Sequence, residues 1–461
     1  MSDCSKQKCA ALAAVVLAAG KGTRMKSNVA KVLHPIMGRP IISYVLDTLT
    51  AVQANPQVIV VGHAAETVRE ACGPDYIYAL QAEQRGTGHA VQTAIPSLDG
   101  FSGNVLIVSG DMPLVTPEVW QNLIELHVRE GNEFTLLTAR SEAHRDFGRI
   151  VRQADGQAVR IVEARDCTPE EYALTEVNLG AYCASADFLR EMLPLLGSNN
   201  AQGELYLTDL VGLGHAHGKR IGAMITPDIE CAMGVNSRAD LAQAGTVIKA
   251  RVLRSLMLSG VTVLDPGSTW VEPSVTVGRD TVILPGTVLQ GKTSIGEACQ
   301  IGPNTQITDS SVGAGSTVTH SVLWQAKTAG GAKIGPFAYL RPGTVLEDNV
   351  KVGDFVEIKN SNIAAGTKVP HLTYIGDADV GSNTNIGCGT ITCNYDGQSK
   401  HRTFIGDHVF IGSNTSLVAP VRVESGAKTG AGAVVTKDVA AESVVVGIPA
   451  HPLRHTNTEQ S

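Results

Sequence analysis

The stretch 270–307, WVEPSVTVGRDTVILPGTVLQGKTSIGEACQIGPNTQI, carries an aliphatic residue at every sixth position. These positions are Val271, Val277, Ile283, Leu289, Ile295, Ile301 and Ile307. The spacing resumes from Ile334 to Ile358 and from Ile405 to Val423, and glycine often follows the aliphatic residue. An α-helix repeats about every 3.6 residues and a strand about every two, whereas hexapeptide repeats are typical of a parallel β-helix. The second half therefore predicts a β-helix with its aliphatic side chains directed into the coil.

The six-residue period is interrupted at about 323–333, 364–373 and 392–404. Interruptions in a repeat protein map to surface loops, so we expect three loops there. Polar residues gather in and between these segments: Arg341, Lys359, His371, Tyr374, Asn394, Tyr395, Asp396, Lys400 and Arg402. Each alone is weak evidence, because loops are polar in any protein. Together, a base, amides and cations beside a stiff scaffold predict a site for an anionic substrate.

The first half alternates strand-like and helical segments, in the order strand 13–17, helix 41–50, strand 57–61, helix 87–95 and strand 105–108. This order predicts a doubly wound, mostly parallel sheet, which binds ligands beyond the carboxyl ends of its strands. Segments 17–25 and 109–111 lie at such ends. In the first, glycines let backbone N–H groups approach phosphate, and Lys21, Arg24 and Lys31 add positive charge. In the second, Asp111 is either a Mg²⁺ ligand or a carboxylate that caps the loop.

The chain of 461 residues is too long for one core and fits two domains. Between them, Ser237 and Asp240 form a helix-start signal, apolar residues follow at helical spacing, and Gly260 closes the segment. We therefore expect domains at 1–236 and 261–461, joined by a linker helix at 237–260 that is about 30 Å long. Such a helix would hold two sites apart.

The composition argues against a nucleic-acid or membrane protein. The formal charge is −7 and only 4% of residues are aromatic, so no basic, aromatic face for nucleic acid is expected. The apolar run 10–19 passes directly into Gly20, Lys21 and Gly22, which indicates a strand and its loop rather than a secretory signal. No other run reaches the roughly 18 apolar residues of a membrane span. The nine cysteines form no C-x-x-C pair, which favours a reduced, cytoplasmic protein.

Several motifs together give a more specific indication. They are LAAGKGTRM at 17–25, AKVLH at 30–34, QAEQRGTGHA at 81–90, SGD at 109–111, GVN at 234–236, PHLTY at 370–374 and ITCNYDG at 391–397. Those of the first half resemble the motifs of sugar-1-phosphate nucleotidylyltransferases. With the hexapeptide half, residues 13–453 are similar to a bacterial family that joins an N-acetylglucosamine-1-phosphate uridylyltransferase to a glucosamine-1-phosphate N-acetyltransferase for cell-envelope synthesis. The resemblance implies a left-handed β-helix, a homotrimer, and a cytoplasmic enzyme that uses UTP, acetyl-CoA and Mg²⁺.

In the first domain, the resemblance assigns nucleotide binding to Leu17, Ala18, Ala19, Gly20, Lys31, Gln81, Gly86 and Thr87. It assigns the sugar phosphate to Gly148, Glu163, Asn178 and Asn236, and Mg²⁺ to Asp111 and Asn236. Arg24 and Lys31 are implied to neutralise charge while the sugar phosphate attacks the α-phosphate of UTP. Ser109 stands where the family often has tyrosine, which puts one sugar contact in question.

In the second domain, the resemblance assigns His371 as the general base that takes a proton from the amine of glucosamine 1-phosphate. The sugar phosphate is assigned to Arg341, Lys359, Tyr374 and Asn385. Acetyl-CoA is assigned to Cys388, Asn394, Tyr395, Lys400, Ser413 and Ala431. Gly447 stands where the family often has arginine, which leaves Arg402 or Arg454 as the cation for the CoA phosphate.

Two other functions stay open at this point. The β-helix could be a scaffold or regulatory module on a monofunctional sugar-1-phosphate nucleotidylyltransferase, or the whole chain could bind sugar nucleotides without turnover. Loops without His371 and Asn394 would favour the first, and the loss of Asp111 or Lys31 would favour the second. Both sets of residues are present, so the sequence favours a bifunctional enzyme.

Overall fold

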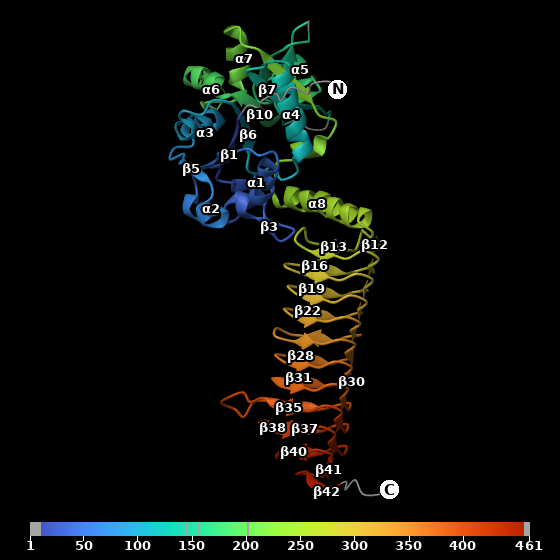
Figure 1. Ribbon diagram of the computed structural model, residues 1–461. Coiled ribbons are helices and arrows are strands. Elements are labelled where there is room, and N and C mark those ends of the chain that lie inside the picture. Colours follow the sequence, from blue (N-terminus) through green and yellow to red (C-terminus); the bar gives the residue numbers. More distant parts are fainter. Residues whose placement is uncertain (1–10, 143–145, 155, 201, 456–461) are drawn as a thin grey trace, which may run out of the picture. The chain divides into compact units, whose positions relative to one another are not determined.

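The computed structural model describes residues 11–142, 146–154, 156–200 and 202–455 (Figure 1). The chain divides into two compact units, residues 1–247 and 248–461, and the boundary falls within the long helix α8 (Arg238–Leu258). Each unit has hydrophobic core clusters of its own, as expected of separate domains.

The first unit is built on a mixed sheet, in which β1 pairs in parallel with both β4 and β6. Only β10 on the main path runs antiparallel to its neighbours, β6 and β7. The strands in spatial order are β11 (Ile221–Ile225), β7 (Phe134–Arg140), β10 (Glu176–Ser185), β6 (Asn104–Ser109), β1 (Leu12–Ala18), β4 (Gln57–Val61) and β5 (Ile77–Leu80). The predicted doubly wound, mostly parallel sheet is confirmed. Because Leu17 of β1 lies opposite Ser109 of β6, the loops that follow these two strands emerge side by side.

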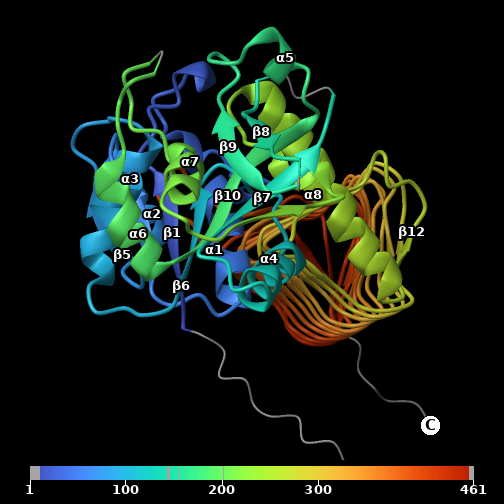
Figure 2. The ribbon, with the colours of Figure 1, turned by 90° about the horizontal axis from the view of Figure 1, so that it is seen from above.

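Helices cover both faces of this sheet (Figure 2). One face packs against α1 (Ile41–Ala51), α2 (Ala65–Cys72) and α4 (Pro117–Arg129), and the other against α3 (Thr87–Ala94), α6 (Ala186–Met192) and α7 (Asp209–Ala216). On the first face, Trp120 of α4 is fully buried in the cluster that contains Leu106 of β6. On the other face, Phe188 of α6 stacks on Phe134 of β7 with 5.2 Å between ring centroids. Burial on both faces explains why the strands read as continuous apolar runs.

A hairpin between β7 and β10 brings three predicted site residues together. It comprises β8 (Arg149–Arg152) and β9 (Ala158–Val162), and it is followed by the short helix α5 (Pro169–Tyr172). β8 also pairs with β10, and the Asn178 amide donates to the carbonyl of Gly148 at 2.9 Å. Glu163 follows directly after β9. The sequence pattern had not indicated this hairpin.

Helix α8 begins with reciprocal capping. The Ser237 hydroxyl accepts from the Asp240 amide at 3.2 Å, and the Asp240 carboxylate accepts from the Ser237 amide at 2.8 Å. These bonds satisfy amides that the first helical turn leaves without partners. Gly260, with a φ of 97°, follows the helix. Across the described residues, no helix, α8 included, is long and apolar enough to cross a membrane.

The second unit is a stack of short strands, from β12 (Thr262–Val263) to β42 (His451–His455), arranged in three sheets of 12, 10 and 9 strands. Pairing is parallel from coil to coil, so Ile283 lies on Ile301 and Ile301 on Val318. The aliphatic residues of the six-residue period are buried in one continuous cluster. Seen along the stack, the coils superimpose (Figure 2). The predicted β-helix of hexapeptide repeats is confirmed.

The prediction of a surface loop is wrong for two of the three interruptions, where the chain continues in strands. Residues 327–328 and 333–334 are strands β23 and β24, and His371 ends strand β30 (Lys368–His371). The period is lost there because some steps between inward-facing residues are one residue short, as from Leu323 to Thr328 and from Ile358 to Ile363. Of the three interruptions, the third is an insertion: Val380 pairs with Ile405 on the next coil. The extra residues form a loop between β34 (Ile391–Cys393) and β35 (Thr403–Ile405) that protrudes from the stack (Figure 1).

Candidate active sites

The loop after β1 folds back on a short 3₁₀ turn that carries Lys31. Gly22 has a φ of 59°, and a Cβ at this position would lie 2.7 Å from the Cβ of Lys31. Glycine is therefore required both by the backbone conformation and by the close approach. A second 3₁₀ turn, Thr23–Met25, presents Arg24. The predicted phosphate loop thus brings two cations to the end of the central strand.

Every residue predicted to hold the nucleotide lines one cavity of about 400 Å³. These residues are Leu17, Ala18, Ala19, Gly20, Lys31, Gln81, Gly86 and Thr87. Gln81 is buried, and its amide nitrogen donates to the carbonyl of Gly86 at 3.1 Å. The Thr87 hydroxyl accepts from the amide of Leu207 at 3.1 Å. The amides and hydroxyls available to read a base edge are therefore held in fixed positions.

An adjoining cavity of about 590 Å³ contains the residues predicted to bind the sugar phosphate and the metal. It is lined by Arg24, Asp111, Gly148, Glu163, Asn178 and Asn236. Ser109, Glu163, Asn178 and Gly180 line both cavities, so the two spaces meet. Asn178 is fixed by its own strand: its side chain donates to the Tyr182 hydroxyl at 2.8 Å and accepts from the Gly180 amide at 3.2 Å.

Oxygen atoms of Asp111 and Asn236 converge on one cation. The Lys31 ammonium forms an ion pair with the Asp111 carboxylate and lies 3.1 Å from the Asn236 side-chain oxygen. Arg24 also donates to this oxygen, at 2.8 Å. The Val235 amide donates to the carbonyl of Asp111 at 2.9 Å, which ties the two segments together. A carboxylate and an amide oxygen that already face a cation are suitable ligands for a hard metal ion.

The protein offers two ligands for Mg²⁺, Asp111 and Asn236, which is fewer than the ion needs. Within the described residues, no group of three or more His, Cys, Asp or Glu side chains is placed to hold a metal. Mg²⁺ is commonly held by one or two carboxylates plus substrate phosphates and water. The pair at Asp111 and Asn236 matches that pattern and would rely on the substrate for its remaining ligands.

Glu163 lies where both cavities meet and is held by the Thr208 hydroxyl, which donates at 3.0 Å. Burial raises the pKa of Glu163, the bond from Thr208 lowers it, and the charges of Asp166 and Asp209 add to the rise. A half-buried carboxylate with a raised pKa is suited to accepting hydrogen bonds from sugar hydroxyls.

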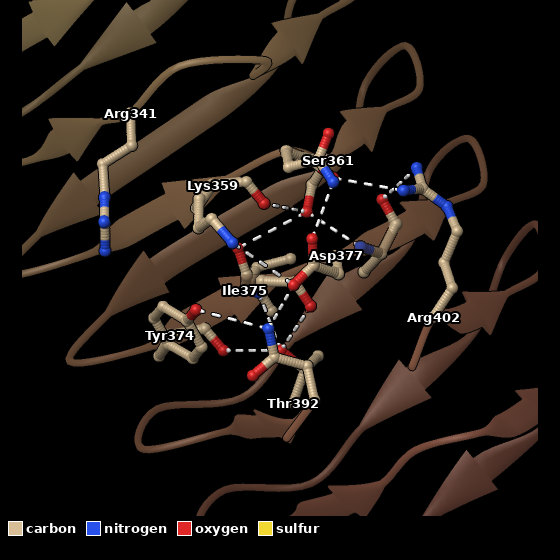
Figure 3. Close-up of polar contacts among 12 residues, drawn as sticks. Arg341, Lys359, Ser361, Tyr374, Ile375, Asp377, Thr392 and Arg402 are labelled. Atoms are coloured by element: carbon tan, nitrogen blue, oxygen red, sulfur yellow. Dashed lines mark hydrogen bonds and ion pairs between the residues drawn. The ribbon is translucent and has the colours of Figure 1, made fainter. Parts of the chain in front are cut away.

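In the second unit, Arg341, Lys359 and Tyr374 lie on consecutive coils of one sheet (Figure 3). Arg341 follows β25 (Tyr339–Leu340), Lys359 ends β28 (Glu357–Lys359), and Tyr374 begins β31 (Tyr374–Gly376). Arg341 pairs with Glu357 at 2.7 Å. The neighbouring Lys359 ammonium lowers the pKa of Lys400. Two cations on adjacent coils of one sheet, with Lys400 of the inserted loop nearby, are chemically suited to an anion.

Asp377 organises this cluster, although the sequence had not singled it out. Its carboxylate accepts from Asn360 at 2.6 Å and from Asn394, and it lies 3.5 Å from the Lys359 ammonium (Figure 3). Burial raises its pKa, but these partners hold the pKa of Asp377 below its usual range. Asn394 also contacts the Tyr374 hydroxyl at 3.5 Å. The signal was present in the spacing, because Asp377 stands one coil after Lys359.

His371 lies in a different sheet, in a column with the predicted acetyl-CoA residues. The register places Asp354 opposite His371, Lys368 opposite Asn385, Asn385 opposite Phe410, and Phe410 opposite Lys428. Counting three positions from each strand start, one residue per coil falls at the same corner: Asp354, His371, Cys388, Ser413 and Ala431. Gly387 and Gly412 precede two of them, and a Cβ on either would lie 2.6 Å from the next coil. The corner is therefore smooth and tightly stacked.

Arg402, one of the two candidate cations for the CoA phosphate, is paired with a carboxylate. Arg402 forms two bonds with the Asp379 carboxylate, and the Nε bond is 2.5 Å long. These bonds hold the pKa of Asp379 below its usual range. The side chain of Arg454, the other candidate for the CoA phosphate, lies outside the described residues. Tyr395 is exposed on the loop and pairs with Lys400 in an isolated bridge.

Comparison with known proteins identifies the family of each unit. Residues 14–205 match the family described as MobA-like NTP transferase domain, and residues 402–437 match bacterial transferase hexapeptide (six repeats). The chain is 48% identical over 434 residues to "Bifunctional protein GlmU" of Desulfitobacterium hafniense, covering 94% of this chain and 95% of that protein. It is 49% identical over 438 residues to the protein of the same name from Pelobacter propionicus, with 94% and 95% covered. The chain therefore belongs to the GlmU family of bifunctional enzymes, with a nucleotidyltransferase unit followed by a hexapeptide acyltransferase unit.

Proposed function

We propose that this enzyme acetylates glucosamine 1-phosphate with acetyl-CoA and then transfers UMP from UTP to N-acetylglucosamine 1-phosphate, giving UDP-N-acetylglucosamine and pyrophosphate. One observation carries the second step: a nucleotide-sized cavity and a sugar-side cavity meet beside Lys31, Asp111 and Asn236. This arrangement supports the meeting of two phosphorylated substrates at a cationic point. The domain assignment that goes with it is 1–236 for uridylyl transfer, 237–260 for the linker helix and 261–461 for acetyl transfer.

Uridylyl transfer needs no covalent nucleophile from the protein. A phosphate oxygen of the sugar attacks the α-phosphate of UTP in line, and pyrophosphate leaves. Arg24 and Lys31 hold and neutralise the phosphates, while Gln81, Gly86 and Thr87 orient the base. Asp111 and Asn236 would hold Mg²⁺, which when bound supplies further charge neutralisation. Gly148, Glu163 and Asn178 position the sugar ring.

Acetyl transfer uses His371 as the general base. The amine nitrogen of glucosamine 1-phosphate attacks the thioester carbon, the C–S bond breaks, and His371 accepts the proton that the amine loses. Arg341, Lys359, Tyr374 and Asn385 bind the sugar phosphate. Asn394 and Tyr395 lie near the reacting groups, and Lys400, Cys388, Ser413 and Ala431 bind acetyl-CoA. The position of His371 in the same column as Cys388, Ser413 and Ala431 supports this assignment.

We also propose a homotrimer in which neighbouring subunits complete the acetyltransferase site. The residues at the corner after the His371 column, Phe337, Phe355 and Leu372, are all exposed and apolar. Each has a positive φ, a conformation that is costly for bulky side chains. An exposed apolar column held in strain beside the base is explained by contact with another subunit. Sedimentation of the full chain tests this, and a monomer would contradict it.

The reaction and the cysteines support a cytoplasmic enzyme of peptidoglycan and lipopolysaccharide precursor synthesis. The seven cysteines that the structure describes form no disulfide with one another, and UTP and acetyl-CoA are intracellular metabolites. Cys4 and Cys9 lie outside the described residues.

The decisive experiment supplies purified enzyme with glucosamine 1-phosphate, acetyl-CoA, UTP and Mg²⁺ and follows CoA and pyrophosphate separately. His371→Ala should lower CoA release by about 10²–10⁴-fold, the usual contribution of a general base, and leave uridylyl transfer from N-acetylglucosamine 1-phosphate intact. Asp111→Ala should abolish pyrophosphate release and spare CoA release. Loss of both activities in either folded variant would contradict two independent sites. Normal CoA release in His371→Ala would contradict the assignment of His371 as the base, and no CoA release by the wild-type enzyme would favour a structural β-helix.

A further inference from the structure

We propose that Asp354 is a positioning residue for acetyl transfer, which fixes the His371 imidazole in the tautomer whose Nε2 is free to take a proton. The inference rests on the proposed function, because it requires His371 to be the base. It names a residue that neither the sequence motifs nor the resemblance had singled out.

The contact between the two side chains is direct and is set by the β-helix. Asp354 ends β27 (Lys351–Asp354), His371 ends β30, and the register places them opposite each other on adjacent coils. The Nδ1 atom of His371 lies 2.5 Å from the Oδ1 atom of Asp354. The Leu372 amide donates to the carbonyl of Asp354 at 3.0 Å, so the backbones that carry the pair are tied together. A Cβ on Gly353 would collide with the carbonyl of Pro370, which shows how closely these coils stack.

The chemistry of the carboxylate decides which nitrogen of His371 carries the hydrogen. Asp354 stays ionised, because the hydrogen bond from His371 and the charge of Lys351 hold the pKa of Asp354 below its usual range. An ionised carboxylate only accepts hydrogen bonds, so the proton in this contact is on Nδ1. In a neutral imidazole the other nitrogen then has a free lone pair. Nε2 is consequently the basic atom, and it can turn toward the substrate.

The strands on either side of Asp354 and His371 carry lysines and a cysteine near the pair. The adjacent strands of this sheet contribute Lys333 from β24 (Lys333–Ile334), Lys351 from β27 and Lys368 from β30. On the other side, β33 (Asn385–Ile386) is followed by Cys388 at the corner position. Of these lysines, Lys351 lowers the pKa of Asp354 and so favours its ionised form. The side of the pair that carries Cys388 leads to the acetyl-CoA positions.

A structural role explains the pair poorly. The side chains of His371 and Asp354 are 54% and 37% exposed, so both remain accessible to solvent and substrate. Exposed ion pairs contribute only about 0–1 kcal/mol to stability. The contact therefore stabilises the coil little, whereas a fixed imidazole orientation matters directly for proton transfer.

The test is Asp354→Asn in the full-length enzyme. Asparagine has the same shape but can donate to Nδ1, which favours the tautomer with hydrogen on Nε2 and removes the base. We expect kcat for CoA release to fall between about 10- and 10³-fold, less than complete loss of the base would cause, with little change in KM for either substrate. ¹⁵N spectra of histidine-labelled enzyme should show the His371 ring changing tautomer, with the signal assigned by its absence in His371→Ala.

Two controls separate this inference from others. Asp348→Asn removes another exposed carboxylate of the β-helix, one that accepts from the Gly330 amide, and should change neither kcat nor the His371 spectrum. Asp354→Glu keeps an acceptor and should recover part of the activity. Wild-type kcat in Asp354→Asn, or a reduced kcat with an unchanged tautomer, would overturn the role of Asp354. If those results accompany an inactive His371→Ala enzyme, the proposed function stands; if His371→Ala is fully active, the base assignment itself fails.

Discussion

Replacing Gly86 by alanine should damage uridylyl transfer through a collision that the structure locates. Gly86 precedes α3 and has a φ of 107° and a ψ of 174°. A Cβ there would lie 2.6 Å from the carbonyl oxygen of Leu205 and 2.9 Å from its nitrogen. Both are backbone atoms, and the Leu205 amide donates to the carbonyl of Arg85, the residue before Gly86, at 2.8 Å. The collision therefore cannot be relieved by rotating a side chain.

The size of the effect follows from these distances. Non-bonded heavy atoms need about 3.5 Å, so the loop that carries Gly86 must move by about 1 Å. Gln81 moves with it, because its amide donates to the Gly86 carbonyl. A misplacement of about 1 Å in a positioning group can cost about 10²-fold in rate, equivalent to about 2.7 kcal/mol. We expect kcat/KM for UTP to fall by about that factor and acetyl transfer to be unchanged.

Gly73 offers a matched control. It ends α2 with a φ of 89° and a ψ of −178°, nearly the conformation of Gly86, but a Cβ there meets no atom within 4 Å. Gly73→Ala therefore introduces the same backbone strain, about 1–3 kcal/mol, without the collision. Pyrophosphate release at varied UTP and the thermal midpoint would be measured for both variants. If Gly86→Ala and Gly73→Ala lost stability equally and both kept wild-type kcat/KM, the steric argument would be refuted.

Two further predictions concern the units themselves. A fragment that ends after Leu258, and so keeps the whole of α8, should form UDP-N-acetylglucosamine from N-acetylglucosamine 1-phosphate; a folded but inactive fragment would contradict a self-contained first site. Asp379→Asn should destabilise the β-helix unit at neutral pH, because Arg402 holds the pKa of Asp379 below its usual value. A depressed folded-state pKa gives stability that is present above the unfolded-state pKa and lost as pH falls through the folded-state value. The difference in urea midpoint between variant and wild type should therefore shrink in acid, and a constant difference would exclude the ion pair as its source.

The fold could be predicted because burial imposes the six-residue period. Val271 and Ile283 are fully buried, and any polar residue at such positions would face the closed interior of the coil. The interruptions were misread because a missing residue and an extra residue both break the period. Thr328 made the shortened coil hard to recognise, because this buried residue has a hydroxyl at an inward position where an aliphatic residue is expected.

The candidate sites were predicted unevenly for a related reason. Motifs identify residues that are close in sequence, such as Ala18 and Gly20, and the nucleotide cavity is built largely from such segments. Asp354 and Asp377 act on partners one coil away, so their roles become visible only when the length of each coil is known. Arg402 is another residue whose partner the sequence did not indicate, because the inserted loop folds back and its guanidinium pairs with the Asp379 carboxylate.

The same electrostatic design appears in both units and bears on how substrates bind. Lys31 is paired with Asp111, Arg341 with Glu357, and Lys359 with Asp377. Three of the cations that are proposed to meet a phosphate thus already have a carboxylate beside them, whereas Arg24 donates to the amide oxygen of Asn236. Substrate binding is therefore an exchange, and the net gain comes from the second charge of a phosphate and from the geometry of its three oxygens. Paired cations also avoid repelling one another before substrate arrives, as Lys359 and Lys400 otherwise would. Each carboxylate offsets the repulsion between cations that stand close together. Removing Glu357 or Asp377 should consequently displace the neighbouring cations, and should not simply make them available to the substrate phosphate.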